Sequence, residues 1–213
     1  MKIEIWSDVV CPWCYIGKRR LERALGQFEH SDDVEIVWRS FQLHPDAPRQ
    51  AIPTTEYLTG RFGPRATEMI AHVTRTAAEE GLTFDYDIAK AVNTIDAHRV
   101  LHLAADEGKG DAAKERLLKA HFGEGADLGD KDTLVRLAAE VGVGPDRVRA
   151  VLDSDQYADE VEADIAQAHA FGASGVPFFV IDRKYGISGA QPTELFLQAL
   201  RTAWTDEQQV APA

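Results

Sequence analysis

Alternating apolar and charged residues at the start of the chain predict a short β-strand. The alternation covers residues 2–6, and its period of two is that of a strand with one buried face. A loop of residues 7–10 follows, and apolar residues then recur at helical spacing from Trp13 to Phe28. The β-branched and aromatic run from Val34 to Phe41 predicts a second strand. The chain therefore begins as strand, helix and strand.

The middle of the chain has a different pattern. From about residue 54 to about residue 172 it is rich in alanine, and its apolar residues recur at the spacing of one helix face. No stretch in it has a convincing strand pattern, and glycines such as Gly81, Gly108 and Gly142 mark the ends of helical segments. The pattern predicts an insertion built of several short helices.

Strand signals return near the C-terminus. Residues 177–182 form an apolar run, a turn is expected at Arg183 and Lys184, and residues 185–188 complete a predicted hairpin. An amphipathic helix with apolar positions from Leu195 to Ala203 closes the pattern. The residues after Thr205 are expected to be a frayed tail.

This order of elements predicts an α/β fold that is interrupted by an all-helical insertion. The α/β domain comprises residues 1–50 and 173–213, and the helical insertion domain comprises residues 51–172. The strands before and after the insertion must meet in one sheet. We therefore expect hinges near residues 45–54 and 170–176.

Candidate chemistry lies in the two cysteines of the chain, Cys11 and Cys14, which enclose Pro12 and Trp13. A structural disulfide between them would close a very small loop and constrain little of the unfolded chain. The pair stands at the start of the first predicted helix, where Pro12 suits the first turn. Unpaired N–H groups there favour the thiolate of Cys11, which is the form that attacks disulfides.

These positions assign a role to each residue of the motif. We predict Cys11 as the nucleophile and Cys14, one turn further along and more buried, as the resolving thiol. Their redox-active disulfide is expected to be the working group, with no separate cofactor. Pro12 and Trp13 are expected to tune the redox potential and to contact the substrate.

A Cys-x-x-Cys pair is also half of a zinc site. A closed structural site needs four ligands, and the chain has no second cysteine pair. His98 and His102, one helical turn apart, would be the candidates for a Cys2His2 set, although two polar residues on one helix face also explain their spacing. The redox interpretation is favoured, and no metal site is predicted.

A second motif, Gly175-Val176-Pro177, opens the strand near the C-terminus. A proline that enters a strand removes a ladder donor, so it belongs at an edge, at a first strand residue or in a cis bond. If the bond is cis, the backbone of Val176 faces outward and can pair with an extended substrate or glutathione. The alternative is a strand-start proline with no role, and the cysteine motif favours the functional interpretation.

Composition and charge narrow the partners. With 23 basic and 35 acidic residues the net charge is −12, and the one basic run, at residues 18–20, suits a solvated helix face. Binding to nucleic acid or to a membrane is therefore not expected. The N-terminus lacks the basic start and long apolar core of a secretory signal, and no run is long enough to span a membrane. We expect a cytoplasmic protein.

Together, these motifs resemble the DsbA family of thioredoxin-fold proteins, specifically its FrnE-like branch. The resemblance rests on residues 11–18, with the sequence CPWCYIGK, after Trp6-Ser7-Asp8. Three further stretches agree in order along nearly the whole chain: Phe41-Gln42-Leu43-His44-Pro45, Asn93-Thr94 with Ala97-His98-Arg99, and residues 175–179 leading to residues 188–192. The resemblance implies a thioredoxin fold interrupted by a helical insertion. It also implies Cys11 as nucleophile, Cys14 as resolving thiol and Pro177 as the cis-proline beside them.

The activity that follows is that of a thiol–disulfide oxidoreductase or disulfide isomerase, forming mixed disulfides with protein or small-molecule substrates. The family is also similar to kappa-class glutathione transferases and 2-hydroxychromene-2-carboxylate isomerases. A glutathione-dependent transferase or isomerase is therefore the alternative, and glutathione is a candidate co-substrate of the oxidoreductase as well.

Three polar residues have two interpretations each. The resemblance implies that the helix with Asn93 and His98 faces the active-site groove, where both would contact substrate. Taken alone, Asn93-Thr94 also suits a helix N-cap, and His98 a surface position. Asp8 either accepts a proton or simply ends the first strand.

Overall fold

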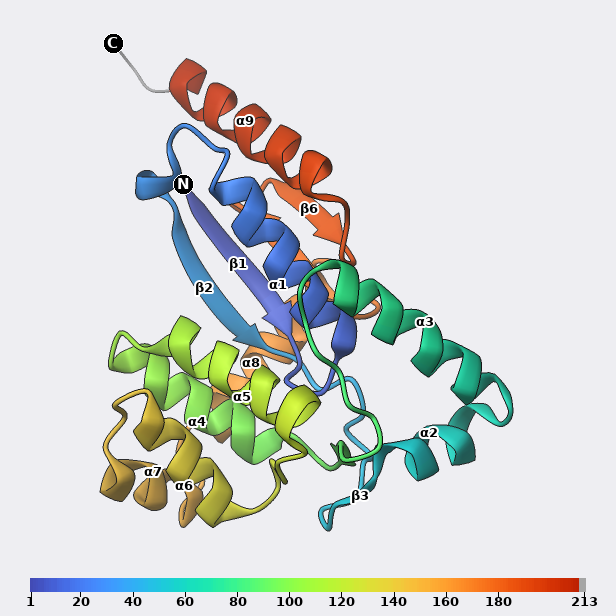
Figure 1. The fold of residues 1–213 in the computed structure, drawn as a ribbon. Coiled ribbons are helices and arrows are strands. Elements are labelled where there is room, and N and C mark those ends of the chain that lie inside the picture. Colours follow the sequence, from blue (N-terminus) through green and yellow to red (C-terminus); the bar gives the residue numbers. More distant parts are fainter. Residues whose placement is uncertain (211–213) are drawn as a thin grey trace.

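A four-stranded sheet with the order β2-β1-β5-β6 lies at the centre of the computed structural model, which describes residues 1–210 (Figure 1). The strands are β1 (Lys2–Ser7), β2 (Glu35–Ser40), β5 (Phe178–Ile181) and β6 (Tyr185–Ser188). β1 is parallel to β2 and antiparallel to β5, and β5 is antiparallel to β6. The predicted strands from the two ends of the chain thus meet in one sheet.

Two helices cover one face of this sheet. α1 (Pro12–Leu25) follows β1 directly, and α9 (Thr193–Val210) closes the described part of the chain beside it (Figure 1). The expected fraying after Thr205 is wrong up to Val210, because the helix continues to that residue. Residues 211–213, the last of the predicted α/β domain and of its tail, lie outside the described residues.

The alternation of β1 divides its side chains between two cores. Ile3 and Ile5 pack with apolar residues of α1 and α9 on one face of the sheet. Trp6 packs on the other face, in a core that includes a residue of α8 (Ala158–Ala170). Glu4 on that face is buried, and it forms ion pairs with Arg39 and Arg183. A central strand covered on both faces explains why even its charged residue is buried and paired.

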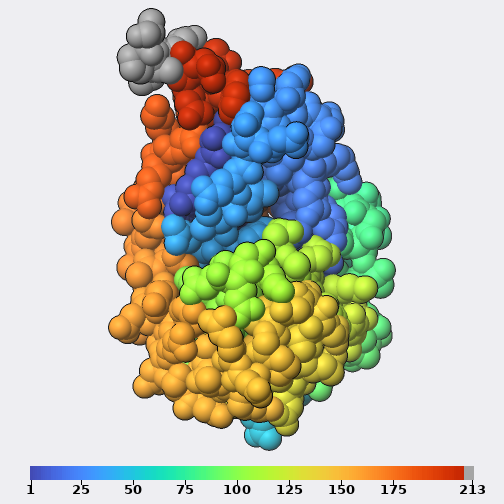
Figure 2. All heavy atoms as spheres, turned by 90° about the vertical axis from the view of Figure 1, so that its left-hand side faces the viewer, coloured from blue at the N-terminus to red at the C-terminus, as the bar shows by residue number. Residues whose placement is uncertain are grey.

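The insertion between β2 and β5 is mostly helical. Its helices are α2 (Thr54–Phe62), α3 (Arg65–Glu79), α4 (Ile95–Asp106), α5 (Gly110–Glu124), α6 (Lys131–Glu140), α7 (Pro145–Leu152) and α8. α4 to α7 share an apolar core of their own. Figure 2 shows the residues from about 100 to 175 as one continuous lower part beneath the two chain ends. The fold is the predicted thioredoxin fold with a helical insertion.

Three short segments differ from the expectation or add to it. The two-residue strands β3 (Ile52–Pro53) and β4 (Lys90–Ala91) pair with each other in an antiparallel manner. The prediction of an insertion without strands is wrong in this detail, because two residues are too few to show an alternating pattern. A 3-10 turn, η1 (Ser31–Asp33), precedes β2. Along residues 1–210, no helix combines the length and apolar character that crossing a membrane requires.

The ring of Phe179 tests how much the core between sheet and helices contributes to stability. Phe179 is 1% exposed, and its ring meets that of Phe196 edge-on with centroids 4.8 Å apart. We expect Phe179→Ala to lower the free energy of unfolding by about 3–5 kcal/mol, measured by denaturant titration. As a control, Leu195→Ala on α9, where the side chain is 41% exposed, should change it by about 0.5 kcal/mol or less. Equal losses in the two variants would contradict this account of the core.

Candidate active site

The two cysteines lie where β1 turns into α1. Cys11 is the residue before the helix, its backbone is extended, and Pro12 is the first helical residue. The Cys11 N–H donates to the Asp8 carbonyl oxygen at 3.3 Å, and the Cys14 N–H donates to the Cys11 carbonyl oxygen at 3.0 Å. Both thiols are free, and both residues are buried. The pair therefore occupies the helix N-terminus, as the sequence predicts.

The second sequence motif lies directly beside the first cysteine. The Val176–Pro177 bond is cis, and the Cys11 thiol lies 3.5 Å from the Val176 carbonyl oxygen, to which it donates. The Val176 N–H has no hydrogen-bond partner within residues 1–210. Segments about 165 residues apart in sequence thus form one site.

A glycine permits this close approach of α1 to the start of β5. A Cβ atom on Gly17 would lie 3.1 Å from Cγ of Pro177 and 3.2 Å from Cζ of Phe179. Such distances are shorter than ordinary van der Waals contacts, so a larger residue at position 17 would push the proline away from the cysteines. Gly17 of the sequence motif therefore allows α1 to pack closely against Pro177.

A buried carboxylate lies under the turn that carries the cysteines. The Asp8 carboxylate accepts a hydrogen bond from the Leu43 N–H at 2.7 Å and lies 3.2 Å from Nε2 of His98. Burial alone would raise the pKa of Asp8, but the hydrogen bond from His98 and the Leu43 amide lower it below its ordinary value. Burial also lowers the pKa of His98. We conclude that Asp8 is ionised and that a neutral His98 donates to it from Nε2.

A buried lysine from α5 balances that carboxylate. The Lys114 side chain is completely buried, and its Nζ donates to the Ser7 carbonyl oxygen at 3.0 Å. Its ammonium lies 5.5 Å from the ring centroid of Trp38. Burial lowers the pKa of Lys114 to about 8, although Cys14, Asp8 and Cys11 favour the charged form. The lysine is therefore charged at neutral pH and close to the thiols.

The lysine and the second thiol correct the expected charge distribution. The neighbouring Cys14 sulfur and burial together raise the pKa of Cys11 well above its ordinary value. Burial opposes ionisation of Cys14 too, but the Cys11 hydrogen bond and the Lys114 charge lower the pKa of Cys14. The pKa of Cys11 therefore does not fall as the helix start alone predicts, because Cys14 and burial oppose ionisation there. The effect of Lys114 on Cys14 is one that helix position alone does not reveal.

Cys11 nevertheless has access to an open space. It lies on the wall of a partly enclosed cavity of about 470 Å³ between the start of α1 and the helices α2 and α3. Pro12, Trp13 and Val176 line the same cavity, and Cys14 does not. Four of the predicted site residues are therefore together at one cavity wall, with Cys14 behind Cys11.

The remaining predicted residues lie elsewhere. Asn93 connects a loop to the start of α4: its amide donates to the Pro45 carbonyl oxygen at 2.9 Å, and its Oδ1 accepts from the Ile95 N–H at 3.0 Å. His98 is buried against Asp8. Neither lines the cavity. The geometry thus favours the capping interpretation of Asn93 and a supporting role for His98, and their contact with substrate stays a prediction.

The residues considered for zinc have other partners. His102 lies 3.1 Å from the Ser40 hydroxyl and 3.2 Å from Asp164, whereas His98 bonds Asp8. Within residues 1–210, no three side chains of His, Cys, Asp or Glu are arranged to hold a metal ion.

Sequence reasoning missed two polar residues of α5 that lie near the thiols. Lys114 and His121 are buried, and they are seven positions apart on a helix whose Leu117 and Leu118 are also buried. A lysine and a histidine at apolar positions of a helical stripe are the signal that could have found them.

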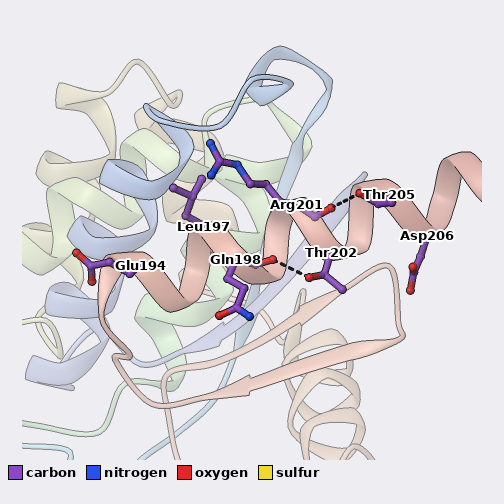
Figure 3. A pocket seen from close by; sticks show the side chains of 7 residues that line it. All are labelled: Glu194, Leu197, Gln198, Arg201, Thr202, Thr205 and Asp206. Carbon is purple, nitrogen blue, oxygen red and sulfur yellow. Dashed lines mark hydrogen bonds between the residues drawn. The ribbon is translucent and has the colours of Figure 1, made fainter.

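A second hollow lies on the surface of α9 (Figure 3). Its lining residues all come from this one helix: Glu194, Leu197, Gln198, Arg201, Thr202, Thr205 and Asp206. The hydroxyls of Thr202 and Thr205 donate to carbonyl oxygens of their own helix, as Figure 3 shows. This hollow shares no residue with the cavity at Cys11.

Comparison with known proteins places these features in a family. Residues 2–201 match the family described as the DSBA-like thioredoxin domain. The chain is 29% identical over 209 residues to the uncharacterized protein YwbO of Bacillus subtilis (strain 168), covering 97% of this chain and 96% of YwbO. It is also similar to the crystal structure of the probable DsbA oxidoreductase SCO1869 from Streptomyces coelicolor, with a TM-score of 0.92 and 42% identity over 100% of this chain and 92% of that one. The cytosolic disulfide reductase DsbM from Pseudomonas aeruginosa shares the fold at a TM-score of 0.68 and 19% identity, over 99% of this chain and 100% of that one.

Replacing the buried lysine tests its electrostatic role. Lys114→Met keeps most of the apolar length and removes the cation, so we expect the pKa of Cys14 to rise because its thiolate loses a stabilising charge. The difference in thiolate fraction between the wild type and the variant should be largest below about pH 8, where Lys114 is charged. Thiolate absorbance of the reduced protein against pH measures it. Lys119→Met, on the exposed face of the same helix, is the control and should leave the titration unchanged.

His121 tests the stability cost of a buried neutral imidazole. Burial lowers the pKa of His121 to about 4, whereas an unfolded chain takes up the proton near pH 6.5. The unfolded state therefore binds more protons between these values, and stability falls as the pH decreases. We expect the free energy of unfolding to fall about 2 kcal/mol less between pH 7 and pH 5 in His121→Gln than in the wild type. Parallel pH profiles of the two proteins would disprove this role.

Proposed function

The chain belongs to the DSBA-like thioredoxin domain family, and from this premise we propose that it is a thiol–disulfide oxidoreductase or disulfide isomerase that works through Cys11 and Cys14. One observation carries the proposal. The Cys11 sulfur lies on a cavity wall beside the Val176 carbonyl oxygen, and a second thiol lies directly behind it at the helix start. A nucleophile with access to substrate and a resolving thiol without it is the arrangement that disulfide exchange needs.

The exchange has two steps. The Cys11 thiolate attacks one sulfur of a substrate disulfide, forms a mixed disulfide and releases the other sulfur as a thiolate, which takes up a proton. The Cys14 thiolate then attacks Cys11 Sγ and displaces the second substrate thiolate. The substrate gains two electrons and two protons as it becomes two thiols. The protein supplies both electrons as it becomes a disulfide, and solvent supplies any proton that an ionised cysteine has already lost. The reverse sequence oxidises a dithiol, and release from the mixed disulfide by another substrate thiol is isomerisation.

The two cysteines can exchange one proton during the cycle. The pKa of Cys14 is lowered and that of Cys11 is raised, so Cys14 ionises before Cys11. Transfer of the Cys11 proton to an ionised Cys14 produces the attacking Cys11 thiolate without releasing a proton to solvent. When the mixed disulfide has formed, Lys114 favours deprotonation of Cys14 for the second step.

The unpaired Val176 N–H supports a contact with the substrate backbone or an equivalent acceptor. Pro12 and Trp13 are proposed as further substrate contacts on the same wall. We also propose a cytoplasmic location. A protein of the same fold, at 19% identity, is described as a cytosolic disulfide reductase, which supports this location.

Single replacements of the cysteines separate the two roles. We expect Cys11→Ser to abolish the reduction of hydroxyethyl disulfide, because the attacking sulfur is absent. Cys14→Ser should lose turnover by about 100-fold or more and accumulate a mixed disulfide at Cys11, because the resolving thiol is absent. Thiol release and mass spectrometry of the intact protein measure both effects.

The same pair of variants addresses the glutathione-dependent alternative. A transferase or isomerase of that type uses only the position of Cys11 and has no resolving step. It would therefore keep its turnover in Cys14→Ser. Full reduction of hydroxyethyl disulfide by the Cys11→Ser protein would remove the dithiol function. Retention of a trapped adduct by Cys14→Ser, with turnover lost, would support the dithiol mechanism.

A further inference from the structure

The cavity beside Cys11 is a site for a small molecule. Its volume of about 470 Å³ falls within the range of about 300–1,000 Å³ that such sites occupy. Most of its lining is apolar, and the wall facing the cysteine consists of side chains from α2 and α3, including Leu58, Phe62, Met69, Ile70 and Val73. A substrate in contact with this wall must present apolar surface to it.

The lining contains no Asp, Glu, Lys or Arg side chain among the described residues. Arg61 of α2 contacts the lining residue Tyr57 at its hydroxyl, but it forms an ion pair with Asp46 at the surface, 3.2 Å away. Burial lowers the pKa of His44 and of His121, so these two lining histidines are neutral at neutral pH. A third lining histidine, His72, is exposed. A substrate carboxylate inside the cavity would therefore find no lysine or arginine beside it, and an unpaired buried charge is costly.

The cavity does contain neutral polar groups. Nδ1 of His44, Nδ1 of His121 and Oγ1 of Thr54 are buried and have no hydrogen-bond partner within the described residues. Thr54 is 7% exposed and His121 is 1% exposed, and both line the cavity. An unsatisfied buried polar atom costs about 1–3 kcal/mol, so three of them around one cavity indicate a ligand that hydrogen-bonds these residues.

We propose that the substrate is a small, largely apolar and uncharged molecule that carries a thiol or disulfide sulfur together with a hydroxyl or carbonyl group. Its sulfur meets Cys11, its apolar part contacts α2 and α3, and its polar group bonds the side chains of His121 and Thr54. This inference rests on the proposed disulfide exchange and specifies its substrate class. Glutathione disulfide, with several carboxylates, and a protein disulfide, with its polar backbone, are the competitors that the lining disfavours.

Matched disulfides test directly whether the cavity disfavours charged substrates. Reduced protein is mixed with dibenzyl disulfide, its 4-hydroxy analogue and its 4-carboxy analogue, which share one type of sulfur and differ at one ring position. Glutathione disulfide, insulin and hydroxyethyl disulfide complete the set. Each rate constant is divided by that of dithiothreitol with the same compound, which removes differences in intrinsic reactivity.

We expect the 4-hydroxy compound to react roughly tenfold or more faster than the 4-carboxy compound and than glutathione disulfide. Equal or faster reaction of the 4-carboxy compound, glutathione disulfide or insulin would overturn the inference and leave disulfide exchange standing. If hydroxyethyl disulfide also fails to react, the proposed function itself is wrong, and the inference fails with it.

Two variants locate the effect in the cavity. Ala47→Phe places a ring in the cavity and should slow the benzyl compounds roughly tenfold or more relative to hydroxyethyl disulfide, which is smaller. Ala112→Phe, the same replacement at an exposed position of α5, is the control.

Thr54→Val removes the hydroxyl with little change of shape, and it should reduce the preference for the 4-hydroxy compound over dibenzyl disulfide. An unchanged preference in folded Thr54→Val, together with unchanged benzyl rates in folded Ala47→Phe, would place the substrate outside this cavity.

Discussion

Two helices of the insertion hold the turn that carries the cysteines. His98 of α4 bonds the Asp8 carboxylate, and Lys114 of α5 donates to the Ser7 carbonyl oxygen. Both charged groups are buried, and a buried charge that loses its partner is strongly destabilising. The turn between β1 and α1 is therefore fixed by side chains that lie about 90 to 107 residues further along the chain. The insertion thus supports the turn with the two cysteines and is more than an addition to a thioredoxin fold.

This arrangement explains why a local rule gives an incomplete account of the thiols. The start of a helix favours an anion, and both cysteines lie within reach of it. The two thiols differ in their neighbours. The hydrogen bond from Cys11 and the charge of Lys114 lower the pKa of Cys14, whereas Cys14 and burial raise the pKa of Cys11. The thiol with the lower pKa is thus not the one that lines the cavity.

The sequence predicted those features that are encoded in short patterns. The alternation in β1 and the Cys-x-x-Cys motif with its proline placed a strand and the helix start. The cis bond before Pro177 was one of three alternatives for that proline and was implied by the resemblance to the DsbA family. Features that depend on contacts between distant segments were missed: the β3–β4 pair is too short for a pattern, and the roles of Lys114 and His121 appear only when α5 is packed under the turn. For Asn93 the sequence left two roles open, substrate contact in a groove and capping of a helix. Only the hydrogen bonds to Pro45 and Ile95 distinguish between them.

The charges of the site and the lining of the cavity point to the same kind of substrate. Asp8 and Lys114 carry opposite charges that cancel. If either cysteine is a thiolate, the three buried groups together have a net charge of −1. An anionic substrate that enters the cavity would be repelled by this charge as well as lacking a cation to pair with. An uncharged molecule avoids both penalties, and it displaces water from around Cys11 as it binds. Removing that water strengthens the attraction between Lys114 and a Cys14 thiolate, and in the proposed exchange this would assist the resolving step at Cys11.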